Sequence, residues 1–184
     1  MTTEKDNFTN GGYEKLPEEK LPEGTLNQVI GGELITSPSP GTYHQKISRR
    51  IFSELLRFVE PRAMGEVFYA PLDVQLSRQE IYMPDIMYIA HSNKEIIRDK
   101  IHGAPDLVVE ILAEGSAYHD LIHKKDVYEA VDVKEYWIVN PMEKTIEVHE
   151  NAGKEFKLIA KVKNSGPIQS KLLNGFGVIL ENIF

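Results

Sequence analysis

The sequence contains no cysteine among its 184 residues. This absence excludes a disulfide scaffold, a thiolate zinc site, an iron–sulfur cluster and a cysteine nucleophile. Long apolar runs are also missing, since none approaches the roughly 18 residues needed to cross a bilayer. The first residues, MTTEKDNFTNGG, are too polar for a secretory signal. We therefore expect a cytoplasmic protein with no membrane partner.

Basic residues are also few relative to acidic ones. There are 21 Lys and Arg against 28 Asp and Glu, which gives a formal net charge of −7. A protein that binds nucleic acid mainly through a basic helix or arm carries the opposite balance. The charge remains compatible with an enzyme that reaches a phosphodiester through a metal ion.

The pattern of residues predicts a flexible N-terminal arm at 1–24 and a single domain at 25–184. The arm is polar and rich in Glu, Lys, Pro and Gly. In order, the elements predicted after it are a hairpin turning at Gly31-Gly32, a helix at 42–59, strands at 66–76 and 81–90, an apolar strand at 107–112, a helix at about 116–131, a strand at 135–140 and a hairpin turning at Gly153. Pro84 marks the entry of the strand at 81–90 or an edge. This order of elements predicts an α/β fold, a mixed α/β layer built on one sheet.

Glu110 is the most informative residue, because it lies inside the apolar run LVVEIL at 107–112. Such a run is typical of a central strand covered on both faces. An ionised carboxylate buried there costs several kcal/mol unless a metal, a cation or a raised pKa compensates. A position facing water on an edge strand, or a structural ion pair, is the alternative interpretation.

Two further charged residues are candidates for the same site. Asp85 shares a strand face with Met87 and Ile89 by simple alternation, although it could also be only a carboxylate at the strand entry. Lys124 shares one side of the predicted helix with Tyr128 and follows Asp120 by one turn, where a solvated lysine is the alternative. Two carboxylates and a lysine can hold Mg²⁺ and stabilise a phosphodiester transition state.

Asp106 is less suited to the same ion. Four residues of extended chain separate it from Glu110 by about 13 Å. We therefore interpret Asp106 as a loop residue that could at most contact the residues that hold the metal.

Other enzyme classes find less support. A serine hydrolase based on Ser116 would need a G-x-S-x-G string, which the sequence lacks. A zinc site based on His119 and His123 would need a third ligand, which is missing.

Four strings carry a family resemblance: MPDIMYI, GAPDLVVEIL, Asp120-x-x-x-Lys124-x-x-x-Tyr128 and VKEYWIVNP. In this order they resemble a large bacterial family of putative restriction endonuclease-like proteins in the PD-(D/E)XK nuclease superfamily. The resemblance extends from about Leu26 to His149. It implies a restriction-endonuclease-like core, a mixed β-sheet flanked by helices, here with additional β-hairpins.

The resemblance also implies site residues. The two acidic positions fall on Asp85 and Glu110, with Glu33 as a further metal ligand from the first elements. The usual lysine position is Leu112 here, and Lys124 on the following helix matches the displaced lysine. His44 resembles a recurrent position that contacts phosphate or caps local backbone. Gln28 stands where relatives often have glutamate, which removes one anionic ligand.

Together these features predict a Mg²⁺-dependent endonuclease that cleaves DNA, with Mn²⁺ as a substitute metal and no small organic cofactor. Family analogy adds a homodimer, since a duplex has two strands to cut. The basic face of the first helix, with Lys46, Arg49, Arg50 and Arg57, could follow a DNA backbone or simply be solvated. A non-catalytic nucleic-acid-binding or regulatory module on the same fold is the alternative function.

Overall fold

The structure is a computed structural model that describes residues 25–113 and 118–184. The predicted arm at 1–24 and Ser116 lie outside these residues. The elements are β1 (Thr25–Ile30), β2 (Glu33–Pro38), α1 (Thr42–Val59), η1 (Glu60–Arg62), β3 (Gly65–Tyr69), β4 (Val74–Gln75), β5 (Ile81–Tyr82), β6 (Ile86–Ala90), η2 (His91–Ile96), β7 (Ile101–His102), β8 (Leu107–Ile111), α2 (Tyr118–Ala130), β9 (Glu135–Asn140), β10 (Thr145–Asn151), β11 (Phe156–Lys163), β12 (Pro167–Gln169), β13 (Gly177–Ile179) and α3 (Leu180–Ile183).

A six-stranded mixed sheet forms the centre of the molecule, with strand order β11-β10-β9-β8-β6-β3. Strand β8 is parallel to β9 and antiparallel to β6, and the crossover between β8 and β9 runs through α2. All five residues of β8 are buried. The prediction of a central strand at 107–112, covered on both faces, is therefore confirmed.

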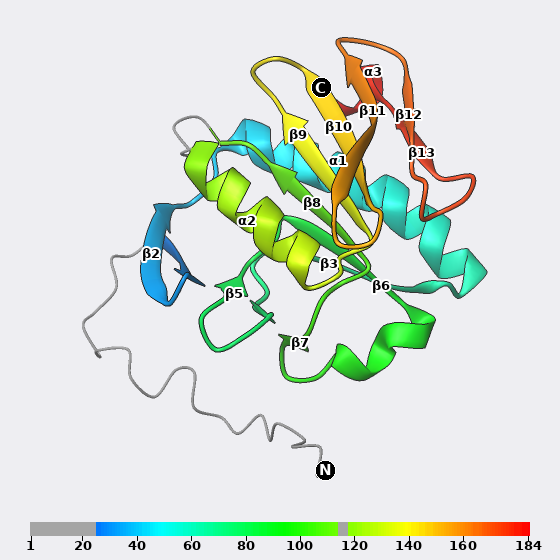
Figure 1. The fold of residues 1–184 in the computed structure, drawn as a ribbon. Helices are drawn as coiled ribbons and strands as arrows, with labels where there is room; N and C mark the ends of the chain where they lie inside the picture. Colours follow the sequence, from blue (N-terminus) through cyan, green and yellow to red (C-terminus); the bar gives the residue numbers. More distant parts are fainter. Residues whose placement is uncertain (1–24, 114–117) are drawn as a thin grey trace.

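Helices α1 and α2 cover opposite faces of this sheet (Figure 1). Alternation along β8 explains which side chains meet each helix. Val109 packs with Ile51 and Leu55 of α1, whereas Val108 packs with Tyr128 of α2. Glu110 has the parity of Val108, so its carboxylate faces α2.

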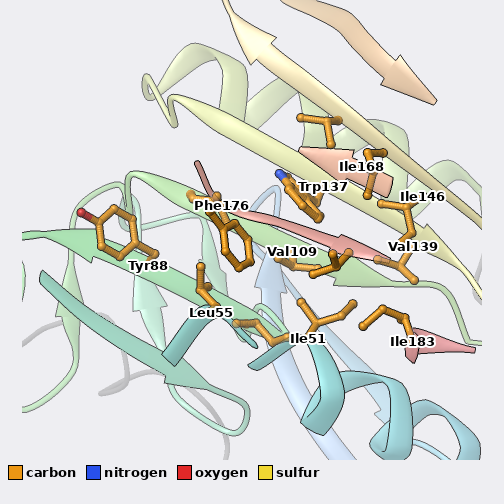
Figure 2. Packing of buried hydrophobic residues seen from close by; sticks show 14 of the residues in the cluster. Ile51, Leu55, Tyr88, Val109, Trp137, Val139, Ile146, Ile168, Phe176 and Ile183 are labelled. Atoms are coloured by element: carbon orange, nitrogen blue, oxygen red, sulfur yellow. The ribbon is translucent and has the colours of Figure 1, made fainter. Parts of the chain in front are cut away.

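The core on the α1 side includes the C-terminal segment (Figure 2). Phe176 and Ile183 join Trp137 and the α1 residues in one buried cluster. Arg50 donates two hydrogen bonds that tie α1 to the chain end, to the carbonyl oxygens of Ile183 (3.0 Å) and Phe184 (3.2 Å). Within the described part of the chain, no helix is long and apolar enough to cross a membrane.

The prediction of one sheet is wrong in detail, because a second, five-stranded sheet has the order β2-β1-β5-β4-β7. The predicted strand 66–76 divides at Pro71 into β3 and β4, and the predicted strand 81–90 divides at Pro84 into β5 and β6. Proline has no N–H to donate to a ladder. Each chain segment therefore leaves one sheet and enters the other at its proline.

Candidate active site

The two predicted acidic residues meet where β6 begins and β8 ends. Asp85 directly precedes β6, and the register pairs Ile86 with Val109, so Asp85 lies beside Glu110 across the ladder. Asp85 Oδ2 accepts a hydrogen bond of 2.8 Å from the backbone N–H of Ile111. This bond fixes one carboxylate oxygen at the end of β8.

Glu110 is only 7% exposed and receives its partners from α2. Lys124 Nζ lies 3.0 Å from Glu110 Oε1 and donates to it, and the hydroxyl of Tyr128 donates to the same oxygen at 2.8 Å. The four-residue spacing places both donors on one face of α2. Glu110 therefore does not face water on an edge strand, and Lys124 is not a solvated surface lysine.

Burial dominates the electrostatics of this cluster. Desolvation raises the pKa of Glu110, the Lys124 charge opposes that rise, and the neighbouring Asp85 adds to it. Burial, together with the Glu110 charge, raises the pKa of Tyr128 well above its usual value. The Tyr128 hydroxyl thus keeps its proton and remains a hydrogen-bond donor to Glu110.

His44, in the first turn of α1, closes the other side of the site. Its Nε2 lies 2.9 Å from the Ile111 carbonyl oxygen and 3.3 Å from Asp85 Oδ2. Two acceptors face this nitrogen, so Nε2 carries the proton. Burial, the largest influence, lowers the pKa of His44, but the hydrogen bond and charge of Asp85 and the Ile111 carbonyl outweigh it and leave the pKa raised.

His44, Asp85, Glu110 and Lys124 line a cavity of about 150 Å³ between the β1–β2 hairpin, α1 and the sheet. Gln28 of β1 lines it and accepts a hydrogen bond of 3.1 Å from the Met83 N–H. Leu112, the position of the usual superfamily lysine, lines it as well. The hairpin thus forms one wall over the two carboxylates.

The donor set fits a hard cation that retains water. Both hydrogen bonds that Glu110 accepts from described residues go to Oε1, which leaves Oε2 for a cation beside Asp85. Among the side chains that the structure describes, no group of three or more His, Cys, Asp or Glu residues could hold a metal ion. Two carboxylates with several waters are a coordination that Mg²⁺ accepts, whereas zinc needs more protein ligands.

Sequence comparison assigns the family. A profile of the Uma2 family, described as "Putative restriction endonuclease", matches residues 12–179. The chain belongs to the Uma2 family. The crystal structure of a putative nuclease of DUF820 from Anabaena variabilis is similar, with a TM-score of 0.72 at 20% sequence identity, over 90% of this chain and 93% of that chain. No significant match is found among curated proteins.

Family membership confirms the resemblance inferred from the four strings, and the structural likeness confirms the nuclease-type α/β fold. Family membership supports a nuclease. At this level of identity, the likeness to the Anabaena protein concerns the fold. Which residues of this Uma2 chain act, and on what, depends on the geometry of its own cavity.

Glu33 and Asp106 lie away from the cavity of this Uma2 chain. Glu33 is exposed at the start of β2, opposite Ile30, and does not line the cavity. Asp106 lies at the opposite end of β8 from Glu110, where its Oδ2 accepts hydrogen bonds from the Ala90 N–H (2.8 Å) and the Asn93 side chain (3.1 Å). Asp120 falls in α2, but its side chain lies outside the described residues.

Sequence reasoning missed Glu80, which joins the hairpin to α2. Its Oε2 accepts hydrogen bonds from the Tyr82 hydroxyl (2.6 Å) and the Gly31 N–H (3.1 Å), and His123 Nε2 lies 3.4 Å from its Oε1. Lys124 Nζ in turn lies 5.6 Å from the centre of the Tyr82 ring. Glu80 follows a run of turn residues, and no local pattern distinguishes it from a solvated glutamate.

Proposed function

We propose that this protein is a metal-dependent endonuclease that hydrolyses phosphodiester bonds of DNA, with Mg²⁺ as the metal and Mn²⁺ as a substitute. The observation that carries the proposal is the buried Glu110 carboxylate. It lies beside Asp85 at a cavity and is held by a lysine and a tyrosine from α2. A cluster with the sole purpose of stability would not need a second carboxylate at the same point.

Asp85 and Glu110 are the residues that would hold the metal. When bound, a divalent ion neutralises phosphate charge and lowers the pKa of a bound water. The backbone N–H of Ile111 and His44 fix the Asp85 carboxylate before any ligand arrives. Tyr128 fixes Glu110 in the same way. A site whose ligands are already oriented loses little free energy to reorganisation.

Lys124 supplies the positive charge. Its ammonium group lies at the cavity wall, 3.0 Å from Glu110 Oε1. In that position it orients an attacking water or stabilises the extra negative charge of the phosphoryl transition state. The low exposure of the pair strengthens this interaction relative to the same charges in water.

A cleavage assay tests the proposal. Purified protein is incubated with single-stranded, duplex and supercoiled DNA in Mg²⁺, Mn²⁺ or EDTA, beside the Glu110→Gln variant and a control, Glu143→Gln, at an exposed turn position. We expect metal-dependent cleavage by the native protein and the control only. Equal cleavage by Glu110→Gln would refute the assignment of the site, and no cleavage by a folded native protein would favour a binding module.

Metal binding is measured separately by calorimetry with Mn²⁺. Saturable binding that disappears in Asp85→Asn supports the carboxylate pair as the metal site. Binding retained in that variant would place the metal elsewhere. We also propose a homodimer, which sedimentation at several protein concentrations would detect or exclude.

A further inference from the structure

A second groove runs along the outer face of α1, with a volume of about 670 Å³. Its lining comes from Thr42, Gln45, Lys46, Arg49 and Phe52 of the helix and from Tyr69 at the end of β3. These helix positions recur at intervals of three and four, so they form one face of α1. The buried stripe of α1, which includes Ile47, Ile51 and Leu55, lies on another face.

The groove concentrates positive charge in an acidic protein. Lys46 and Arg49 are exposed, and no Asp or Glu lines the groove, although the chain has a net charge of −7. The two other cations of this helix are engaged, since Arg50 bonds the C-terminal carbonyls and Arg57 pairs with Glu54. Within the described part of the chain, Lys46 and Arg49 have no such partner. Their charges are therefore available to an anionic ligand.

Tyr69 adds an exposed aromatic surface to these charges. The residue is 59% exposed, yet its ring is held edge-on to Phe52 with the centroids 4.7 Å apart. An ordered aromatic ring that stays open to solvent is a platform on which a nucleic-acid base can stack. In a duplex the bases are already stacked on one another, so this feature favours a single strand.

The groove adjoins the candidate active site. Pro40 lines both cavities. On the sheet side, the N–H of Ala70, next to Tyr69, donates a hydrogen bond of 3.1 Å to the backbone carbonyl of Asp85. The helix face from Thr42 to Ser53 is about 16 Å long at 1.5 Å per residue.

We propose that this groove binds single-stranded DNA as it leaves the cleavage site, with Lys46 and Arg49 contacting phosphates and one base stacking on Tyr69. The proposal rests on the proposed nuclease function and gives that function a substrate path. A preference for single-stranded or locally opened DNA follows from it.

Binding is tested by fluorescence anisotropy with a labelled single-stranded oligodeoxynucleotide of mixed sequence in EDTA, which prevents cleavage. We expect the Lys46→Ala/Arg49→Ala variant to lower the slope of log affinity against log salt by about 1.4, the value for two phosphate contacts on a single strand. Tyr69→Ala should weaken binding at least about fivefold, whereas Tyr69→Phe retains it. Arg57→Ala, on the same helix but outside the groove, is the matched control and should bind like the native protein.

The outcomes separate this proposal from the proposed function. If the groove variants keep both metal-dependent cleavage and the anisotropy of the native protein, the groove is not a DNA site, but the nuclease proposal is retained. Single-strand binding that depends on Lys46, Arg49 and Tyr69 without any cleavage would support the groove and refute the enzyme. Three results would overturn the groove as a DNA site. They are no binding by the folded native protein, a loss of affinity in Arg57→Ala equal to that in the groove variants, and dissociation of a dimer in Tyr69→Ala.

Discussion

Replacing Lys124 with methionine leaves the Glu110 carboxylate buried without its cation. The two charged atoms lie 3.0 Å apart, and at an effective dielectric constant of 20 their attraction is about 5.5 kcal/mol. Removal of one partner from a buried pair typically costs about 3–5 kcal/mol. We expect Lys124→Met to lower the free energy of unfolding by that amount at pH 8. Lys125→Met, at the adjacent and more exposed lysine, should cost less than about 0.5 kcal/mol.

The pH dependence of this loss is the sharper test. Without Lys124 the pKa of Glu110 rises further, because the cation opposes the effect of burial. A carboxyl group with a raised folded-state pKa contributes its stability below the unfolded pKa and loses it as pH rises through the folded value. The deficit of Lys124→Met should therefore shrink toward acid pH, by up to about 1.4 kcal/mol per pH unit.

Urea unfolding followed by fluorescence of Trp137, the only tryptophan and a buried one, measures both quantities. The double variant Glu110→Gln/Lys124→Met completes the cycle and should be more stable at pH 8 than Lys124→Met alone, because no unpaired charge remains. A deficit independent of pH, or strictly additive losses in the cycle, would refute the buried ion pair.

Substitutions at three further residues test individual features of the structure. Glu135→Ala removes a fully buried carboxylate, which accepts hydrogen bonds from a tryptophan indole and from two backbone amides of the C-terminal segment. Urea unfolding should show that the free energy of unfolding falls by about 3 kcal/mol or more. Gly65→Ala would place a Cβ 2.0 Å from the Ile89 carbonyl oxygen, and we expect a drop in Tm equivalent to more than about 3 kcal/mol. Burial, with the Lys125 charge, lowers the pKa of His149 from 6.5. The stability that neutral His149 contributes should therefore be lost as pH falls through its folded-state pKa. Urea unfolding of His149→Gln at several pH values should show no such loss of stability toward acid pH.

Much of the fold follows from local pattern. The helix predicted at 42–59 agrees with α1 because an apolar stripe, a preceding run of prolines and Pro61 define it without help from the rest of the chain. The pattern predicts a continuous strand at 66–76, since alternation shows where a strand can form but not which sheet it joins. That choice depends on pairing between distant segments, such as β4 with β7, which no single window contains.

The candidate site also contains residues that the sequence predicts and residues that it does not. The family resemblance assigns Asp85 and Glu110 to one site, and the spacing along the strand predicts that Asp106 cannot share an ion with Glu110. The turn before Glu33 is also predicted, but the pattern does not show that Glu33, paired with Ile30 at the hairpin end, is exposed and away from the cavity. Glu80 gave no signal, because its partners, including Gly31 and His123, come from three separate segments.

The location of the cation on α2 couples the site to helix packing. A lysine two residues after Glu110 would share its strand face, but Leu112 occupies that position and lines the cavity. Lys124 instead reaches the carboxylate from the helix that crosses this face. The same helix is anchored by Tyr128, whose ring packs 5.5 Å from Tyr82 and 5.3 Å from Tyr136. A displacement of α2 therefore moves both donors away from Glu110 together, so the charge balance of the site depends on the docking of one helix.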